Sequence, residues 1–195
     1  MALLLAGGQM ALISYLALYC QDQLLASVVP DPSARAVAAG GYLAVCQLGG
    51  AFSRVFCGLL SDRVFAGRRT VVLAMGAVMS ALMSLVVAGL GPDTPAAMLT
   101  LVVFASGAAA MGWSGLYLAL AAEMAGPAYA ATSVGVNLTL MQCGTVSGAP
   151  LFGFVVDLSG SYQTAWLALG GLYVVASFMA ALAMRGEKRG LSASS

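Results

Sequence analysis

The sequence predicts an all-α integral membrane protein with six transmembrane helices, and three properties of its composition lead to this fold class. Of the 195 residues, 61% are hydrophobic and only 8% are charged, whereas about a quarter of the residues in a soluble domain are charged. The mean hydropathy is +0.96. The net charge of +1 provides no basic surface for nucleic acid. These properties exclude a soluble domain and a nucleic-acid-binding protein.

Charged residues and prolines divide the chain into apolar segments of about 20 residues or more, the length that an α-helix needs to cross a bilayer. The first three segments are Met1–Gln21, about Ala36–Ser61, and Thr70–Leu90. A polar stretch through Asp31 separates the first two, and the charged loop DRVFAGRR separates the second and third. The first segment lacks the positively charged start of a signal peptide, so it is predicted to be a span.

The remaining three segments follow the chain break GPDTP. They are Ala96–Ala122, about Tyr129–Val156, and a last segment that follows Tyr162 and ends at Met184. Glu123 and the pair Gly126 and Pro127 separate the fourth span from the fifth, and the turn DLSGSY separates the fifth from the sixth. Polar residues therefore separate each apolar segment from the next, and this separation predicts six spans.

The distribution of Lys and Arg predicts the orientation, because cytoplasmic loops carry the excess of positive charge. Arg63, Arg68 and Arg69 lie between the second and third spans, and further Lys and Arg residues follow the sixth. Only Arg35 lies on the opposite side. Both termini are therefore predicted to be cytoplasmic, with the protein in the inner (plasma) membrane.

The chain also contains an internal repeat with a period of 95 residues. Both copies contain the pattern Q-x-G-x8-G-x3-D. The matching residues are Gln47, Gly49, Gly58 and Asp62 in the first copy and Gln142, Gly144, Gly153 and Asp157 in the second. Each copy holds three spans, an odd number, so the second copy must lie inverted.

Inverted repeats of three helices are typical of secondary transporters, whose substrate binds near the membrane midplane between units that rock. This predicts one six-helix domain over residues 1–187, with a first repeat over about 1–92 and a second over about 96–187. Residues 188–195 are predicted to form a disordered cytoplasmic tail. The alternative is a helical bundle whose glycines have a similar spacing by chance.

A charged cluster is predicted at the cytoplasmic end of the second span. Arg54, Gly58 and Asp62 are spaced four residues apart and so share one helical face. A charge at the helix centre costs about 2.5 to 3.5 kcal/mol, which favours a functional role for Arg54. With Glu123 as a further partner, Arg54 and Asp62 are predicted to form a latch, and Gly58 to let a neighbouring backbone approach. The alternative is a set of snorkelling charges that only anchor the topology.

The segment from Gly58 to Arg69 resembles the loop signature G-x-L-a-D-R-x-G-R-R of the major facilitator superfamily, with two extra residues before its second glycine. GWSGLYLALAAEMAGP and SGAPLFGFVVDLSGSY are similar to helices near the end of bacterial members. The resemblance covers nearly the whole chain and corresponds to the last six of the family's twelve helices. It implies the C-terminal half of a proton- or ion-coupled secondary transporter, with a second six-helix half as partner. It also implies gating by Asp62 and Arg63 on the cytoplasmic side, next to Arg68 and Arg69 of the same signature.

In this family the first helix of each triplet lines the central cavity. The resemblance therefore implies that the first and fourth spans line a cavity here. Their polar and aromatic residues at helical spacing are Tyr15 and Tyr19 in the first and Ser106, Trp113 and Tyr117 in the fourth. Such rings combine apolar bulk with one hydrogen bond, which suits a small organic substrate. The alternative is helix packing or an aromatic belt at the interface, which we favour for Tyr19.

Small residues allow helices to approach closely in membranes. The residues predicted to serve this purpose are Gly49, Gly144, Gly148 and Gly153.

Enzymatic functions find little support. The chain has no histidine, which excludes His-based metal sites and Ser-His or Cys-His nucleophile pairs, and neither a metal nor a cofactor is expected. The four cysteines occur singly inside apolar segments, as small buried hydrophobes do. Two alternatives to half of a larger transporter remain open: a truncated fragment without transport activity, and a small transporter that works as a homodimer. The substrate and the coupling ion also stay open.

Overall fold

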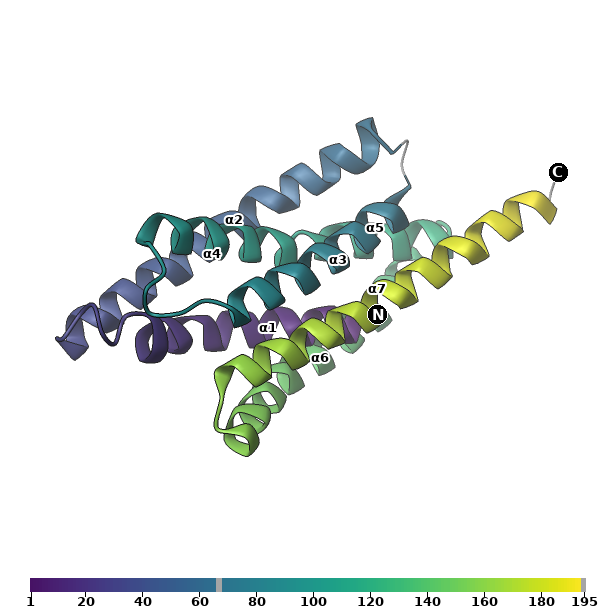
Figure 1. The fold of residues 1–195 in the computed structure, drawn as a ribbon. Helices are drawn as coiled ribbons and strands as arrows, with labels where there is room; N and C mark the ends of the chain where they lie inside the picture. Colours follow the sequence, from purple (N-terminus) through teal and green to yellow (C-terminus); the bar gives the residue numbers. More distant parts are fainter. Residues whose placement is uncertain (66–67, 194–195) are drawn as a thin grey trace.

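The helices of the structure follow the order of the predicted spans, and Figure 1 shows how they are arranged. The structure is a computed structural model that describes the backbone of residues 1–65 and 68–193 and the side chains as far as residue 183. Within this part of the chain, six helical stretches are long and apolar enough to cross a membrane. The elements are α1 (Ala2–Tyr19), η1 (Cys20–Leu24), α2 (Pro32–Arg63), α3 (Arg69–Ala88), α4 (Ala96–Met111), α5 (Trp113–Ala125), α6 (Ala130–Ser159) and α7 (Tyr162–Ala193).

Two predicted boundaries need correction. α2 begins at Pro32, four residues before the predicted start, because Asp31 caps it: the carboxylate accepts the Ala34 N–H at 2.9 Å. The hydrogen bond from the Ser33 hydroxyl, together with this N–H, lowers the pKa of the Asp31 carboxyl. At the other end of the chain, α7 is helical as far as Ala193, through most of the segment predicted to be disordered. Residues 194–195 lie outside the described part, as do residues 66–67 of the loop signature.

The sequence predicted that the fourth span is one continuous helix, but the structure divides it into two helices. α4 ends at Met111 and α5 begins at Trp113, with a turn at Gly112. The two segments still form one span, Ala96–Ala125. At the turn, a Cβ on Gly112 would lie only 2.8 Å from Ser53 Oγ and 2.9 Å from Cys57 Sγ. The absence of a side chain at Gly112 therefore lets α2 pack against the break.

The packing of the helices follows the inverted repeat. The most extensive contacts are those of α1 with α6, α2 with α4, and α3 with α7. In the repeat, α1 corresponds to the α4–α5 span, α2 to α6, and α3 to α7. The α1–α6 pair and the α4–α2 pair are therefore equivalent, and the α3–α7 pair is equivalent to itself. This is the pairing that two inverted three-helix units require. The predicted fold class is confirmed.

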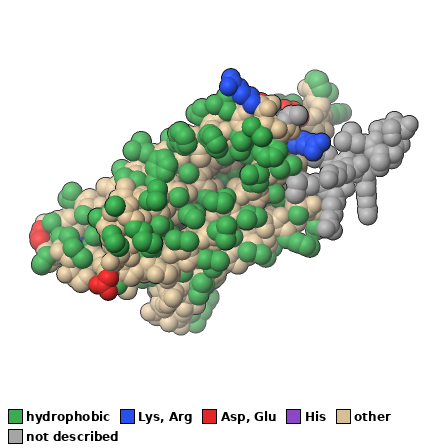
Figure 2. Space-filling view, turned by 45° about the horizontal axis from the view of Figure 1, so that its top comes forward, with side chains coloured by type: hydrophobic (Ala, Val, Ile, Leu, Met, Phe, Trp, Pro, Cys, Tyr) green, Lys and Arg blue, Asp and Glu red, His purple; other side chains and the backbone are tan. Residues whose placement is uncertain are grey.

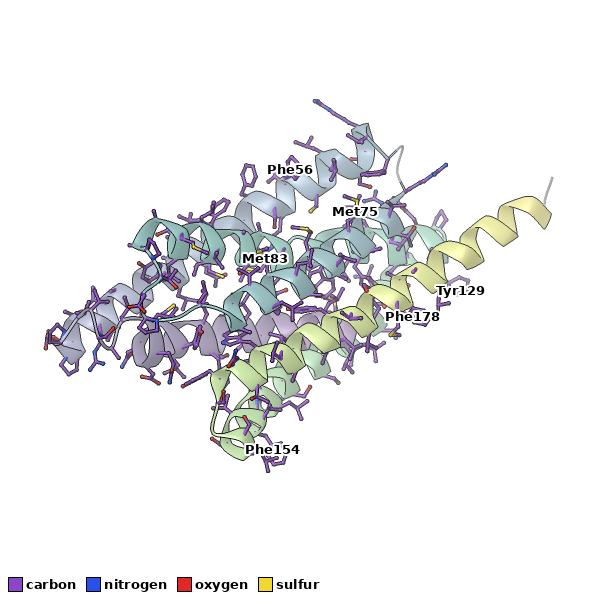
Figure 3. The ribbon with its side chains drawn as sticks, in the orientation of Figure 1. Phe56, Met75, Met83, Tyr129, Phe154 and Phe178 are labelled. Atoms are coloured by element: carbon purple, nitrogen blue, oxygen red, sulfur yellow. The ribbon has the colours of Figure 1, made fainter. Side chains whose placement is uncertain are left out.

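Apolar side chains cover the flank of the bundle that faces the viewer in Figure 2. Large side chains such as Phe154 of α6 and Phe178 of α7 point away from the bundle and are exposed (Figure 3). A contiguous apolar surface of this kind is unsuited to water but matches the hydrocarbon core of a bilayer. The chain is therefore a multi-pass membrane protein.

The two ends of the bundle carry different charges. One end carries Arg63, Arg68 and Arg69, which lie in or next to the loop between α2 and α3. We call this end of the bundle the basic end. The N-terminus and the α5–α6 connection lie at the same end, because each span reverses the direction of the chain. The opposite end carries four aspartates and one arginine: Asp22, Asp31, Asp93, Asp157 and Arg35.

Candidate functional site

A bidentate ion pair joins two helices at the basic end. Arg69, the first residue of α3, donates from Nε to Glu123 Oε2 at 2.9 Å and from Nη2 to Oε1 at 2.6 Å. Glu123 lies in the last turn of α5 and its side chain is 56% exposed. In this structure Glu123 therefore binds Arg69 and not Arg54, and the latch of Arg54, Asp62 and Glu123 stays a prediction. The chain reverses between α2 and α3, which brings Arg69 beside the end of α5.

The exposure of Glu123 limits what this pair contributes to stability. In a double-mutant cycle of Arg69→Gln and Glu123→Gln, we expect a coupling energy of about 0.2 to 1 kcal/mol, the range measured for exposed pairs. The measurement is the free energy of unfolding of the purified protein in mild detergent at low and high salt. A coupling above about 2 kcal/mol that salt does not reduce would contradict this expectation, and would indicate a pair that is shielded from solvent.

The other charges of the predicted latch lie on the exposed face of α2. Arg54 and Asp62 are both exposed, and neither forms an ion pair with any other residue in the described part of the chain. Gly58, between them, has no described atom within 4 Å of a Cβ position, so the close approach of a neighbouring backbone stays a prediction. Arg63 and Arg68 are likewise exposed. The charges of the predicted latch on α2 therefore face outward from the bundle.

α2 and α6 are the least covered helices of the bundle. In the most apolar 18-residue stretch of each, only 22% of the residues are buried, compared with 39–50% in the other four spans. Gln47 and Gln142, which occupy equivalent positions in the two repeats, lie near the middle of these helices. Both are exposed, and neither has a hydrogen-bond partner among the described residues. An amide without a partner is costly in hydrocarbon, so these faces are better suited to water or protein than to lipid.

The opposite sides of α2 and α6 are tightly packed. A Cβ on Gly49 would collide with the Phe104 carbonyl of α4, and one on Gly144 with the Leu3 carbonyl of α1. These two glycines are equivalent in the repeat and serve equivalent helix pairs. Gly148 lies against the backbone of Gly7, while a side chain at Gly153 would meet the Tyr15 hydroxyl.

The turn at Gly112 separates the residues of the fourth span that were predicted to line a cavity: Ser106 lies before the turn, and Trp113 and Tyr117 lie after it. Trp113 and Tyr117 remain neighbours, with ring centroids 6.0 Å apart. The Tyr117 hydroxyl donates to Asn137 Oδ1 at 2.8 Å, which ties α5 to α6. Ser106 is buried elsewhere and donates to the Val102 carbonyl at 2.7 Å. The contact of Asn137 was not predicted from the sequence, although an amide inside an apolar span is itself a signal for a polar contact.

The two tyrosines of α1 are engaged in packing. Tyr19 is buried, and its hydroxyl hydrogen is directed between the Val87 and Leu90 carbonyls, at 3.1 and 2.9 Å. Tyr15 packs on Phe152, with ring centroids 4.7 Å apart. Tyr19 therefore links α1 to the end of α3, and it also lines a small polar pocket there together with Leu90 and Tyr162.

Six apolar spans in two inverted triplets define a multi-pass membrane protein of the kind from which secondary transporters are built. The model of the Major Facilitator Superfamily matches residues 1–146. The chain therefore belongs to the major facilitator superfamily, as the loop signature indicated. This family membership points to a transporter and not to an enzyme.

Two relatives illustrate the similarity. The chain is 31% identical over 139 residues to an uncharacterized MFS-type transporter of Mycobacterium tuberculosis, in an alignment that covers 71% of this chain and 30% of that protein. It is 27% identical over 150 residues to human monocarboxylate transporter 11, covering 72% of this chain and 31% of that protein. The match thus spans about 30% of the length of each of these relatives.

Proposed function

We propose that the chain is the C-terminal six-helix half of a secondary active transporter that moves a small organic solute across the inner membrane by alternating access. The observation that carries this proposal is the pair of incompletely covered helices, α2 and α6, with Gln47 and Gln142 exposed at mid-membrane. A second six-helix unit packed against these helices would cover their apolar residues. It would also enclose a hydrated pathway in which the amides are solvated.

The second unit would be supplied either by a longer polypeptide or by a second copy of this chain. The basic end would lie on the cytoplasmic side, because positive charge is retained there. A fragment without transport activity is the competing possibility, and it predicts that no preparation containing the chain accumulates a solute.

A small organic anion is the substrate class that the charges favour. Arg54 carries a positive charge inside α2 that the described part of the chain leaves unpaired, and an ionisable residue within a span marks a functional site by default. The similarity to a protein named monocarboxylate transporter 11 is in keeping with a carboxylate ligand. Arg54 would bind that carboxylate when the pathway is open toward the basic end.

The remaining charges of the basic end would form the gate. Asp62, Arg63 and Arg68 are exposed where the second unit would approach. The pair of Arg69 and Glu123 would hold the end of the loop in place while the gate opens and closes. In this proposal the latch closes between the two units, and not within the chain.

The test is uptake into vesicles that contain the chain together with its second unit, or the chain alone where crosslinking in mild detergent yields a dimer. The probes are radiolabelled lactate and pyruvate, with glycerol as an uncharged comparison. We expect saturable uptake of the carboxylates above protein-free vesicles and no such uptake of glycerol. Equal uptake by protein-containing and protein-free vesicles would contradict the proposal.

A further inference from the structure

A groove of about 570 Å³ runs between α3 and α7. Its floor consists of small residues: Ala74 of α3 is buried and Ser177 of α7 is half-buried. Larger side chains form its sides, and those of Val78 and Phe178 are 47% and 63% exposed. The Ser177 hydroxyl is already engaged, because it donates to the Val174 carbonyl at 2.7 Å. The groove is therefore apolar, and no residue of α2 or α6 lines it.

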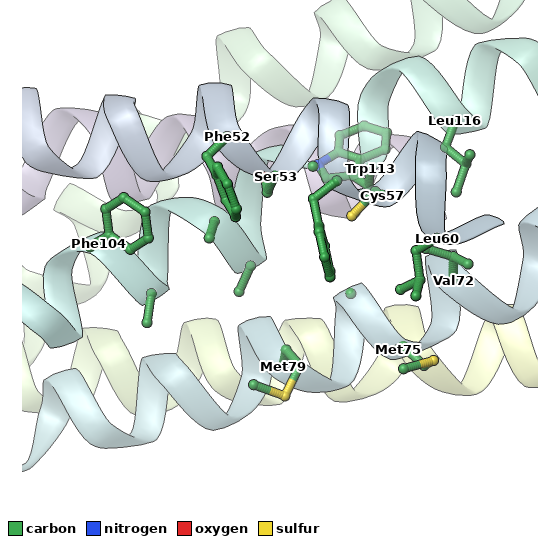
Figure 4. A pocket seen from close by; sticks show the side chains of 16 residues that line it. Phe52, Ser53, Cys57, Leu60, Val72, Met75, Met79, Phe104, Trp113 and Leu116 are labelled. Atoms are coloured by element: carbon green, nitrogen blue, oxygen red, sulfur yellow. The ribbon is translucent and has the colours of Figure 1, made fainter. Parts of the chain in front are cut away.

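Two methionines of α3 form one side of this groove. Met75 and Met79 line it, and Figure 4 shows the same two side chains along α3 at a second cavity, opposite Phe52 of α2. That cavity adjoins the α2 face, which the proposed second unit would cover. The methionines therefore separate the groove from the proposed contact between the units, and the groove belongs to the side of the chain that faces lipid.

The groove extends over one half of the membrane thickness. On α3 it runs from Val71, in the first turn, to Met79 near the middle of the helix, and on α7 it follows the facing segment 174–181. From Val71 to Met79 the helix rises about 12 Å, at about 1.5 Å per residue, and half of a bilayer's hydrocarbon core is about 15 Å thick. Toward the opposite end the helices are in direct contact: a Cβ on Gly170 would lie 3.4 Å from Leu85 Cδ2. The groove thus matches one acyl chain of the leaflet at the basic end.

A positive charge lies at the mouth of the groove. Arg68 precedes Val71 by three residues, nearly one helical turn, and the Val71 N–H donates to the Arg68 carbonyl at 3.2 Å. The Arg68 side chain is exposed and forms no ion pair with any residue that the structure describes. The neighbouring Arg69 is already bound to Glu123. Because Val71 begins the groove at the edge of the span, Arg68 lies at the depth of the lipid headgroups, where an arginine binds phosphate.

We propose that the groove between α3 and α7 binds one acyl chain of an anionic phospholipid whose phosphate is bound by Arg68. A zwitterionic lipid offers the same acyl chain, but the cation in its headgroup offsets the attraction between its phosphate and the arginine. One arginine near the membrane surface favours an anionic lipid by about fivefold. The site is independent of transport. Arg68 is also one of the charges assigned to the proposed gate, so the test measures lipid binding and not uptake.

The test uses the full chain in mild detergent and measures bound lipid by native mass spectrometry. The probes are phosphatidylglycerol and phosphatidylcholine with the same acyl chains, added at equal concentration. We expect about five times more bound phosphatidylglycerol than phosphatidylcholine. Arg68→Gln is expected to make the two lipids bind equally, whereas Arg63→Gln, which removes an exposed arginine of α2 at the same end, keeps the preference. Equal binding of both lipids to the parent protein, or a preference that survives Arg68→Gln, would overturn the proposal.

A groove-filling variant tests the position of the acyl chain. Val78→Trp places an indole in the groove and is expected to remove the species that carries one bound phosphatidylglycerol. Val175→Trp is the matched control, because Val175 is 53% exposed on α7 but does not line the groove. Both positions are exposed, so both variants are expected to elute from detergent as the parent protein does. Phosphatidylglycerol binding that Val78→Trp leaves at the level of Val175→Trp would show that the lipid binds elsewhere, contrary to the proposal.

Discussion

Replacing Arg54 by glutamine is expected to reduce carboxylate uptake at low substrate concentration by about 100-fold. Arg54 lies inside α2, away from the arginines near the two ends of that helix, and the described residues provide it with no carboxylate partner. Removing one member of a hydrogen-bonded charge pair from a desolvated site costs about 2 to 5 kcal/mol, because the other charge stays unpaired. At 1.36 kcal/mol for each factor of ten, the expected loss corresponds to about 2.7 kcal/mol, which lies in the lower half of this range. The measurement is initial uptake of radiolabelled lactate, corrected for the amount of protein in the membrane.

The matched control is Arg35→Gln, which removes a positive charge from the start of the same helix, at the opposite end of the bundle. We expect this variant to keep most of the uptake. The kinetic constants distinguish the two roles open to Arg54: a substrate ligand raises KM, whereas a gate residue mainly lowers the maximal rate at an unchanged KM. Uptake by Arg54→Gln equal to that of Arg35→Gln would exclude both roles.

Replacing Gly148 by leucine is expected to prevent α1 and α6 from packing, and so to destabilise the bundle by about 3 kcal/mol or more. A Cβ at this position would lie 2.6 Å from the Cα of Gly7, and also against its carbonyl. These are backbone atoms, so no change of rotamer relieves the collision and the helices must separate. Overpacking in a well-packed interior typically costs about 1 to 3 kcal/mol even where side chains can adjust.

Gly135→Leu on the same helix is the control for this effect. Gly135 is exposed and has no atom within 4 Å of its Cβ position, so leucine there gains helix propensity without a collision. We expect Gly148→Leu to lose its monodisperse elution in detergent and to unfold at a lower temperature, while Gly135→Leu behaves as the parent protein. Equal stability of the two variants would contradict the close contact between α1 and α6.

The spans and the repeat could be predicted from the sequence because their signals are local or periodic. The length of apolar segments fixes the number of spans, and the recurrence of Gln47 and Gly49 at Gln142 and Gly144 fixes the relation between the halves. Both signals are visible without knowing which helices touch. The same holds for the family, whose loop signature is contiguous in the chain.

The contacts of the site could not be predicted in the same way. Arg54 and Arg69 were both possible partners for Glu123, and the choice depends on where α3 begins relative to the end of α5. The turn at Gly112 was missed because single glycines are common in membrane helices, and the approach of Ser53 and Cys57 to Gly112 is not visible in the sequence. The capped start of α2 was misplaced because Asp31 and Pro32 also fit a loop.

The most direct test of the central claim is the accessibility of α2 and α6 to water at mid-membrane. In a variant whose four cysteines are replaced by alanine, single cysteines are placed at Gln47 and Gln142 and, as controls, at the exposed apolar positions Val78 of α3 and Val174 of α7. The measurement is the rate of reaction with a charged, membrane-impermeant thiosulfonate in intact membranes. A transport pathway along α2 and α6 predicts reaction at Gln47→Cys and Gln142→Cys at least about ten times faster than at the controls, since thiols in hydrocarbon stay protonated and out of reach of the reagent. Equally slow reaction at all four positions would contradict the account.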